Sequence, residues 1–170
     1  RDLRMSRGLG DVYKRQVLAV TAMLVSAIPF SVSAHTNDNY FTVQVSSTTS
    51  VSIDSTAQKK DNTTSSYIRY SGKDVSGPRQ WIATIWGASA KNASSWTDCT
   101  TYYAGTSTKR STAYITKGTK GYVRQDVRET YGSSAWARVG GKGCGYAASY
   151  VSAVWSPDSV AESGCVDYNG

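Results

Sequence analysis

Histidine is almost absent from this chain of 170 residues, in which His35 is the single example. Serine and cysteine nucleophiles need a histidine or an equivalent base beside them, and the expected place of His35 at the start of the mature chain does not suit that role. The chain also has no Gly-x-Ser-x-Gly and no His-Glu-x-x-His motif. These absences predict a protein that is not an enzyme and has no catalytic, metal-binding or cofactor-binding residues.

Glycoside hydrolysis needs only a pair of carboxylates, so the missing motifs do not exclude it. The available carboxylates are Asp98, Asp126, Glu129 and Asp158. Arg124 and Arg128 alternate with Asp126 and Glu129, and this arrangement is typical of an ion-paired, solvated segment. We therefore favour a structural role for these charges.

Cysteine is scarce, with Cys99, Cys144 and Cys165 and no Cys-x-x-Cys pair. With a single histidine, the chain has no Cys/His ligand set for zinc. In an exported protein we expect one disulfide and one remaining thiol, and the sequence leaves all three pairings open.

Long apolar runs are limited to residues 17–30, an uncharged and mostly apolar run of 14 residues. A transmembrane helix needs roughly 18 or more such residues. Basic residues precede the run and Val32-Ser33-Ala34 follows it, which is the pattern of a signal peptide cleaved after Ala34. We predict a signal peptide at 17–34, a secreted mature chain from His35, and no membrane span in that mature chain.

Residues 1–16 are treated separately, because residues 6–16 resemble a translated sequencing-library adapter. They carry five basic and two acidic residues, so the formal net charge of +7 falls to +4 in the mature chain. This charge permits weak attraction to an anionic surface and is too small to predict nucleic-acid binding.

Short segments of alternating apolar and polar residues, separated by Gly, Ser, Thr and Asn, fill the mature chain. Residues 41–46 alternate as a half-buried strand does, and residues 79–89 are apolar on both faces, which predicts a central strand. Further strands are expected at 51–53, 67–70, 100–103, 113–116, 135–139 and 146–155. The pattern predicts an all-β fold, an antiparallel β-sandwich of about seven short strands over residues 35–160, followed by a tail at 161–170.

The structure of three segments is less clear from the pattern. In residues 122–131 the apolar residues recur every four positions, as in a helix, but β-branched residues and flanking glycines favour a strand. The glycine-rich residues 140–145 precede an alternating segment, so we expect a hairpin connection and not a phosphate-binding loop. The polar residues 58–62 are expected to form a loop.

Aromatic side chains are the main candidates for ligand binding, because the chain has 12 Tyr and 5 Trp. Flat rings with polar edges stack on sugars. The possible platform comprises Trp96, Tyr102, Tyr103, Trp136, Tyr146 and Tyr150. The structural alternative, which we favour, is that Tyr fills half-buried pleats while Trp81, Trp86 and Trp155 belong to the core.

Residues 154–160 read Val-Trp-Ser-Pro-Asp-Ser-Val, and residues 38–41 and 60–67 read Asp-Asn-Tyr-Phe and Lys-Asp-Asn-Thr-Thr-Ser-Ser-Tyr. These segments resemble a family of small secreted Gram-positive bacterial proteins of unknown function that end in a Trp-Ser-Pro-Asp-Ser motif. The resemblance spans most of residues 38–160. It implies export and a small β domain rich in Ser, Thr and Tyr, and it assigns no activity. Independently, Pro157 and Asp158 are expected to end the final strand.

The first functional hypothesis is a secreted, non-catalytic binding or interaction protein of the bacterial cell envelope. Its partner would be a cell-wall polymer, a glycan or another surface protein. The alternatives are a carbohydrate-binding module, suggested by the aromatic residues, and a bacteriocin-like secreted protein, suggested by small size and mild positive charge.

Overall fold

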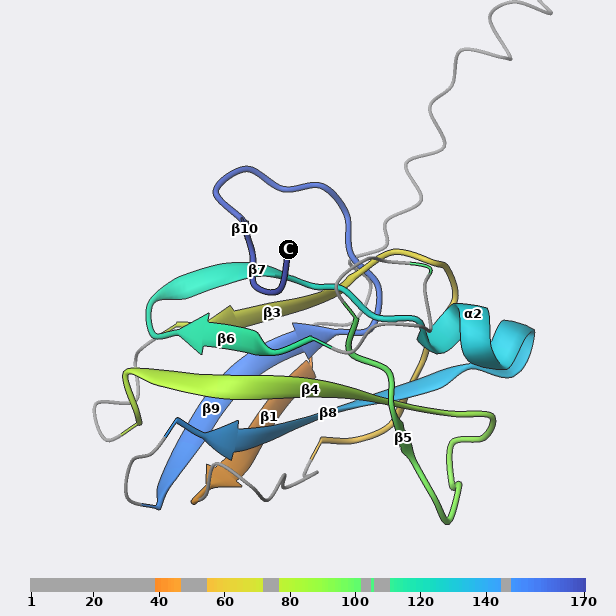
Figure 1. The fold of residues 1–170 in the computed structure, drawn as a ribbon, viewed down its shortest axis with the longest axis horizontal. Helices are drawn as coiled ribbons and strands as arrows, with labels where there is room; N and C mark the ends of the chain where they lie inside the picture. The colour runs from red at the N-terminus through yellow and green to blue at the C-terminus, as the bar shows by residue number, and fades with distance from the viewer. Residues whose placement is uncertain (1–38, 47–54, 72–76, 102–104, 106–110, 145–147) are drawn as a thin grey trace, which may run out of the picture. The chain divides into compact units, whose positions relative to one another are not determined.

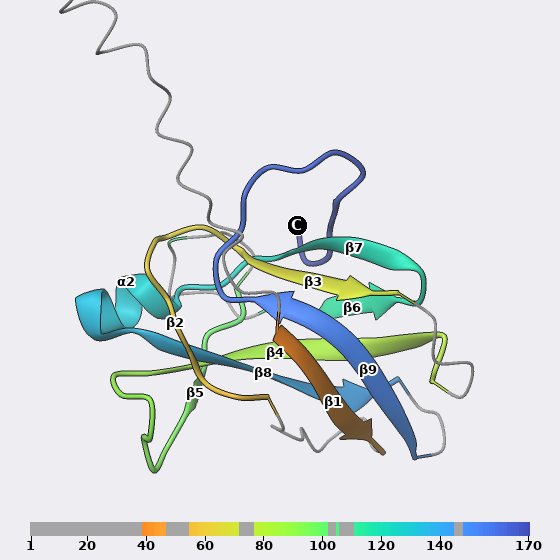
Figure 2. The same cartoon turned by 180° about the vertical axis from the view of Figure 1, so that it is seen from behind.

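The computed structural model describes residues 39–46, 55–71, 77–101, 105, 111–144 and 148–170. The predicted signal peptide, His35 and the strand predicted at 51–53 lie outside these residues. Within them, two β-sheets pack face to face, with the sheet that contains β4 nearer the viewer in Figure 1 and the sheet that contains β1 nearer in Figure 2. The all-β sandwich predicted from the sequence is confirmed.

The first sheet, here called the β1 sheet, has the strand order β1-β9-β3-β7-β10. Its antiparallel strands are β1 (Asn39–Val45), β3 (Ser66–Tyr70), β7 (Thr119–Val123) and β9 (Ser149–Ser156). The short edge strand β10 (Val166–Asp167) pairs in parallel with β7, so the sheet is not wholly antiparallel.

The second sheet, here called the β4 sheet, has the order β2-β8-β4-β5, and β6 also pairs with β4. Its strands, all antiparallel, are β2 (Gln58–Lys59), β4 (Gln80–Ala88), β5 (Thr97–Asp98), β6 (Ala113–Thr116) and β8 (Trp136–Gly143). Three of the ten strands in the described part of the chain have two residues, so the predicted number of about seven matches the longer ones.

The core lies between the sheets and follows the predicted alternation. Phe41, Val43 and Val45 of β1 are buried, whereas the intervening Thr42 and Gln44 are exposed. Strand β4 is buried on both faces, as expected for a central strand. Of the three tryptophans assigned to the core, Trp81 and Trp155 are fully buried, while Trp86 is only half-buried.

The strand predicted over residues 122–131 is wrong beyond Val123. Strand β7 ends there, and α2 (Val127–Tyr131) follows, continued by the 3-10 helix η1 (Gly132–Ser134). Val127 and Tyr131 pack over Gly87 of β4, where an added Cβ would lie 3.1 Å from Val127 Cγ1 and 2.9 Å from Tyr131 Cε2. Because Gly87 has no side chain, this face of α2 can pack there. The four-residue period of the apolar residues therefore indicated the helix correctly.

The glycine-rich residues 140–145 do not form a hairpin connection. Gly140, Gly141 and Gly143 belong to β8, which pairs with β4 in one sheet, whereas β9 pairs with β1 and β3 in the other. An added Cβ on Gly141 would lie 2.6 Å from the Trp81 ring. The glycine therefore accommodates a core tryptophan, and the chain crosses between sheets after β8.

Two other local predictions need correction. The strand predicted at 100–103 is present in its described residues only as bridges at Thr100, which pairs with Gln125, and Thr101, while β5 forms at 97–98 and residues 102–103 lie outside the described residues. Residues 58–59 of the predicted loop form β2 at the edge of the β4 sheet.

The expected disulfide is absent, because none of Cys99, Cys144 and Cys165 is bonded to another cysteine. Cys99 is buried in the core, with its Sγ facing Gly87 of β4. Cys144 follows β8, and Cys165 lies before β10 with its Sγ 3.9 Å from Glu162 Oε2.

We expect a thiol reagent to label Cys144 and Cys165 in the folded chain and Cys99 only after unfolding. Burial raises the pKa of the Cys144 thiol, so Cys144 should react more slowly than an unperturbed thiol at neutral pH. Mass spectrometry of the labelled chain, with and without denaturant, measures this order. Labelling of a single cysteine in denaturant without reductant would instead reveal a disulfide.

Candidate functional site

The outer face of the β4 sheet carries the two tryptophans of the predicted ligand platform, Trp96 and Trp136. Along β8 the side chains of Ala137 and Val139 point into the core, so the half-buried Trp136 and Arg138 point outward. Arg138 pairs in register with Trp86 of β4, and the Arg138 Nε–H donates a 2.8 Å hydrogen bond to the Ser55 carbonyl.

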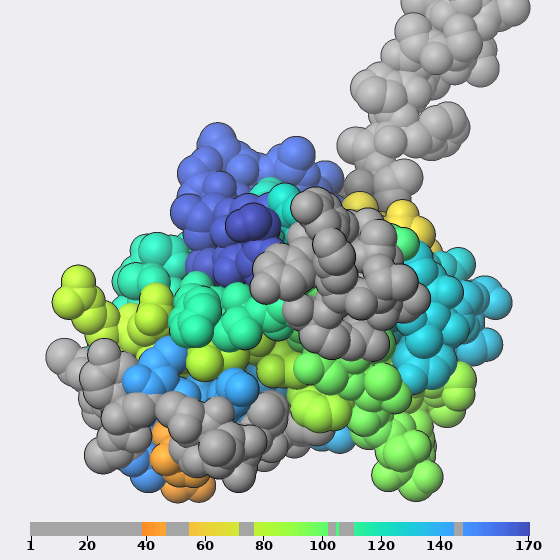
Figure 3. Space-filling model, viewed as in Figure 1, coloured from red at the N-terminus to blue at the C-terminus, as the bar shows by residue number. Residues whose placement is uncertain are grey.

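The loop of residues 89–96 brings the other tryptophan to this face. It joins β4 to β5 and projects at the lower right of Figure 1 and Figure 3. The Trp96 Nε1–H donates a 3.1 Å hydrogen bond to the Ala93 carbonyl, and the Ala93 N–H bonds to the Ala90 carbonyl at 3.3 Å. The loop thus fixes the orientation of the indole.

Each of these two rings has a cation over it. The Arg138 Cζ lies 5.4 Å from the centroid of the Trp96 ring, and the Lys91 Nζ lies 5.8 Å from that of Trp136. Both separations are within the roughly 6 Å range of cation–π attraction. Aromatic and positively charged groups therefore alternate across this face.

Two open clefts adjoin the rings and meet at Thr56 and Ala57. The Trp96 cleft has a volume of about 310 Å³ and is lined by Thr56, Ala57, Lys91, Asn92, Ala93, Trp96 and Arg138. The Trp136 cleft has a volume of about 350 Å³ and is lined by Asn39, Thr56, Ala57, Gln58, Lys59, Asp61, Trp136, Ser156, Pro157 and Asp158. Among the described residues, two cations and no carboxylate line the Trp96 cleft, whereas the Trp136 cleft has charges of both signs.

The six aromatic residues of the predicted platform do not form one surface. Trp96 and Trp136 lie beside neighbouring clefts of the β4 sheet, but Tyr150 is exposed on β9 of the β1 sheet. Tyr102, Tyr103 and Tyr146 lie outside the described residues. Sequence reasoning missed Lys91 and Arg138, which no motif distinguishes from other surface cations.

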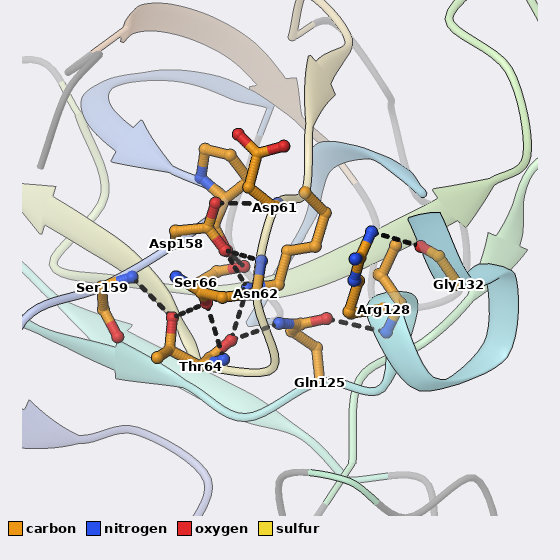
Figure 4. A network of polar contacts seen from close by, with 12 residues as sticks. Asp61, Asn62, Thr64, Ser66, Gln125, Arg128, Gly132, Asp158 and Ser159 are labelled. Carbon is orange, nitrogen blue, oxygen red and sulfur yellow. Dashed lines mark hydrogen bonds and ion pairs between the residues drawn. The ribbon is translucent and has the colours of Figure 1, made fainter. Parts of the chain in front are cut away.

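A buried ion pair lies next to the Trp136 cleft. Lys60 is completely buried, and its Nζ donates a 2.5 Å hydrogen bond to Oδ1 of Asp158, which is 8% exposed. Asp158 Oδ2 accepts a 3.0 Å bond from the Asp61 N–H, and Oδ1 accepts one of 3.3 Å from the Asn62 N–H. Figure 4 shows the Asp158 carboxylate directed at this segment. Asp158 therefore holds the chain between β2 and β3 against the end of β9.

Further hydrogen bonds surround this pair (Figure 4). The Lys60 ammonium also donates to the Thr64 carbonyl at 2.6 Å and to Asn62 Oδ1 at 3.4 Å. The Ser159 N–H donates to Thr64 Oγ1 at 3.0 Å, and Ser66 Oγ donates to the Pro157 carbonyl at 3.1 Å. The two segments at 60–67 and 154–160, which the sequence shows far apart, thus form one network.

Burial lowers the pKa of Lys60 below its usual value by disfavouring the charged ammonium. The negative charges of Asp158, Glu129 and Asp61 act in the opposite direction, with Asp158 the strongest of the three. A lysine in this setting loses its proton more readily than one in water. It is also costly to leave without its partner.

Residues 28–159 match the family model described as a protein of unknown function, DUF2712. The chain belongs to the DUF2712 family. The network of Lys60 and Asp158 lies within the matched residues, as do both clefts. No curated protein and no solved structure shows significant similarity to this DUF2712 chain.

The described part of the DUF2712 chain also bears on the candidate carboxylates, on metal ligands and on membrane-spanning helices. Asp126 is completely buried, so the prediction that it lies in a solvated segment is wrong. Among the described residues, no group of three or more His, Cys, Asp and Glu side chains is placed to hold a metal ion. No helix in the same residues has the length and apolar content needed to cross a membrane.

Proposed function

We propose that this protein is a secreted, non-catalytic binding protein of the bacterial cell envelope that recognises an anionic carbohydrate polymer through the Trp96 cleft. The observation that carries the proposal is one open cleft lined by the fixed Trp96 ring, by Arg138 over that ring and by Lys91. Export rests on the signal peptide predicted at residues 17–34.

The chemistry of the Trp96 cleft suits a sugar that carries an acidic group. Arg138 covers one face of the Trp96 indole, so a sugar would stack its C–H groups on the other face, and the indole N–H is already used by Ala93. Arg138 and Lys91 supply charge-assisted donors for a carboxylate or phosphate. The Asn92 amide and Thr56 hydroxyl are available at the same cleft for sugar hydroxyls.

The adjoining Trp136 cleft supports a polymer in preference to a single sugar. Both clefts are lined by Thr56 and Ala57, so a ligand chain leaving the Trp96 cleft meets Trp136 next. A volume of about 310 Å³ is at the small end of ligand pockets, which favours one sugar unit in each cleft. Weak binding at each unit would then add up along the polymer.

We expect Trp96→Ala to weaken binding of oligogalacturonate by about tenfold or more, which corresponds to roughly 1.4 kcal/mol. Titration calorimetry measures the affinity, and the neutral oligosaccharide of matched length, an oligomer of dextran, should bind more weakly. Raising the salt to about 0.5 M should reduce the affinity without abolishing it, because charge attraction is screened while ring stacking persists.

Tyr150→Ala is the matched control, because Tyr150 is an exposed ring, 56% accessible, on the opposite sheet. Its affinity for the acidic oligomer should equal that of the unaltered chain. Equal losses in Trp96→Ala and Tyr150→Ala, or no binding of either oligomer, would refute the assignment of the Trp96 cleft. Trp136→Ala should cause a smaller loss that grows with oligomer length.

A further inference from the structure

Lys60 and Asp158, neither of which lines the Trp96 cleft, bring a primary amine and a carboxyl group together inside the protein. The residues are 98 positions apart in the sequence, yet Nζ lies 2.5 Å from Oδ1. One carbonyl bond farther, the Asp158 Cγ is within about 3.7 Å of Nζ. Reacting atoms in a near-attack arrangement are about 3–3.5 Å apart, so a small rotation of the carboxyl group closes the difference.

The other contacts of the amine direct its nitrogen toward Asp158. Two N–H bonds are held by the Thr64 carbonyl at 2.6 Å and by Asn62 Oδ1 at 3.4 Å. The third N–H faces Asp158 Oδ1. When that proton passes to the carboxylate, the lone pair it leaves behind faces the same carboxyl group.

Backbone donors occupy the positions that would stabilise charge on the carboxyl group. The Asp61 N–H donates to Oδ2 at 3.0 Å, and the Asn62 N–H donates to Oδ1 at 3.3 Å. During nucleophilic attack on Cγ, negative charge develops on Oδ2, where the Asp61 N–H is already in place. These preset donors lower the barrier without any rearrangement of the backbone.

Burial makes the uncharged pair that the reaction needs easier to reach than it would be in water. Lys60 is fully buried, and desolvation lowers its pKa, so proton transfer to Asp158 to give an amine and a carboxylic acid costs less than in water. Asp158 also lines the open Trp136 cleft, which gives a released water molecule a route to solvent.

We propose that Lys60 and Asp158 form an intramolecular amide bond that joins the segment between β2 and β3 to the end of β9. After proton transfer, Nζ attacks Cγ and the C–O bond to Oδ1 breaks. The ammonium loses two protons in all, and they leave with Oδ1 as one water molecule. The product is a neutral amide, the charges of the starting pair cancel, and neither an oxidant nor a further reactant is consumed.

The mass of the intact, denatured chain tests the bond directly. We expect the purified chain to be lighter than its sequence by the mass of one water molecule, in addition to any loss from removal of a signal peptide. Digestion should yield a branched peptide in which residues 60 and 158 are linked. Lys60→Arg, which keeps a positive charge but has no ε-amine, should regain the full mass of its sequence.

Lys59→Arg is the matched control, because Lys59 is the exposed neighbour of Lys60. This substitution should leave the mass deficit unchanged. The unaltered chain alone decides the matter, whether or not a variant folds. A full-mass chain with unlinked peptides containing residues 60 and 158 would overturn the proposal and leave an ion pair only. Neither Lys60 nor Asp158 lines the Trp96 cleft, so the calorimetric test of Trp96→Ala and the mass of the chain are separate measurements, and the two proposals can fail separately.

Discussion

Asp158→Ala is expected to lower the free energy of unfolding by about 3–5 kcal/mol relative to a chain that holds the Lys60–Asp158 ion pair, the usual cost of removing one partner of a buried ion pair, and by more relative to a chain that carries the proposed amide bond. The substitution leaves the Lys60 ammonium buried without its counter-charge, and it removes the acceptor for the Asp61 and Asn62 N–H groups. Urea unfolding followed by tryptophan fluorescence measures the loss.

An exposed ion pair provides the control for this prediction. Lys120 Nζ lies 2.5 Å from Glu162 Oε1, with both side chains about a third or more exposed, so Glu162→Ala should cost less than about 1 kcal/mol. The double variant Lys60→Met with Asp158→Leu removes both charges and should recover most of the loss that comes from the unpaired Lys60 charge, while any stability from the proposed amide bond stays lost. A loss in Asp158→Ala as small as that in Glu162→Ala would contradict the assignment of a buried, stabilising pair.

The strands that alternate with period two were predictable because their pattern is local. The alternation of Phe41, Val43 and Val45 predicts β1, and the two apolar faces of residues 79–89 predict β4 in the opposite sheet. In each case the side chains themselves record which face is buried. The same information identifies Trp81 as a core residue.

Elements that pack against a distant glycine gave conflicting signals in their own residues, and those residues alone could not decide between helix and strand or between turn and strand. Helix α2 packs where Gly87 of β4 has no side chain, and β8 approaches Trp81 through Gly141. A glycine in the sequence signals either a turn or a close approach, and only its tertiary neighbour decides between them. Tertiary context thus overrode the propensity that favoured a strand at 127–131.

Only part of the candidate site was predictable from the sequence. The sequence identified Trp96 and Trp136 as possible ligand-binding residues, but strand pairing determines that Tyr150 lies on the other sheet. Lys60 was hidden, because a lysine within the polar residues 58–62 is typical of a solvated loop. The one available signal was the pair of motifs at 60–67 and 154–160, which gain their meaning only from contact with each other.

Trp81→Ala is expected to lower the free energy of unfolding by about 3–5 kcal/mol, because it empties a large, fully buried site. Trp81 is on β4, and its ring lies 6.1 Å from the ring of Phe41 on β1, at an interplanar angle of 61°. This edge-to-face contact joins the two sheets. Denaturant unfolding gives the loss, and Trp81→Phe should retain a substantial part of the stability.

The contact between Trp81 and Gly141 makes this prediction more specific. Gly141→Ala alone places a Cβ 2.6 Å from the Trp81 ring and should cost about 1–3 kcal/mol through overpacking. In the Trp81→Ala background the added methyl group enters the space that the ring has left, so its cost should fall toward zero. The double-mutant cycle measures that difference. Additive losses would mean that Gly141 is required by its backbone alone, whereas a strong coupling would show that Gly141 makes room for the Trp81 ring of the neighbouring strand.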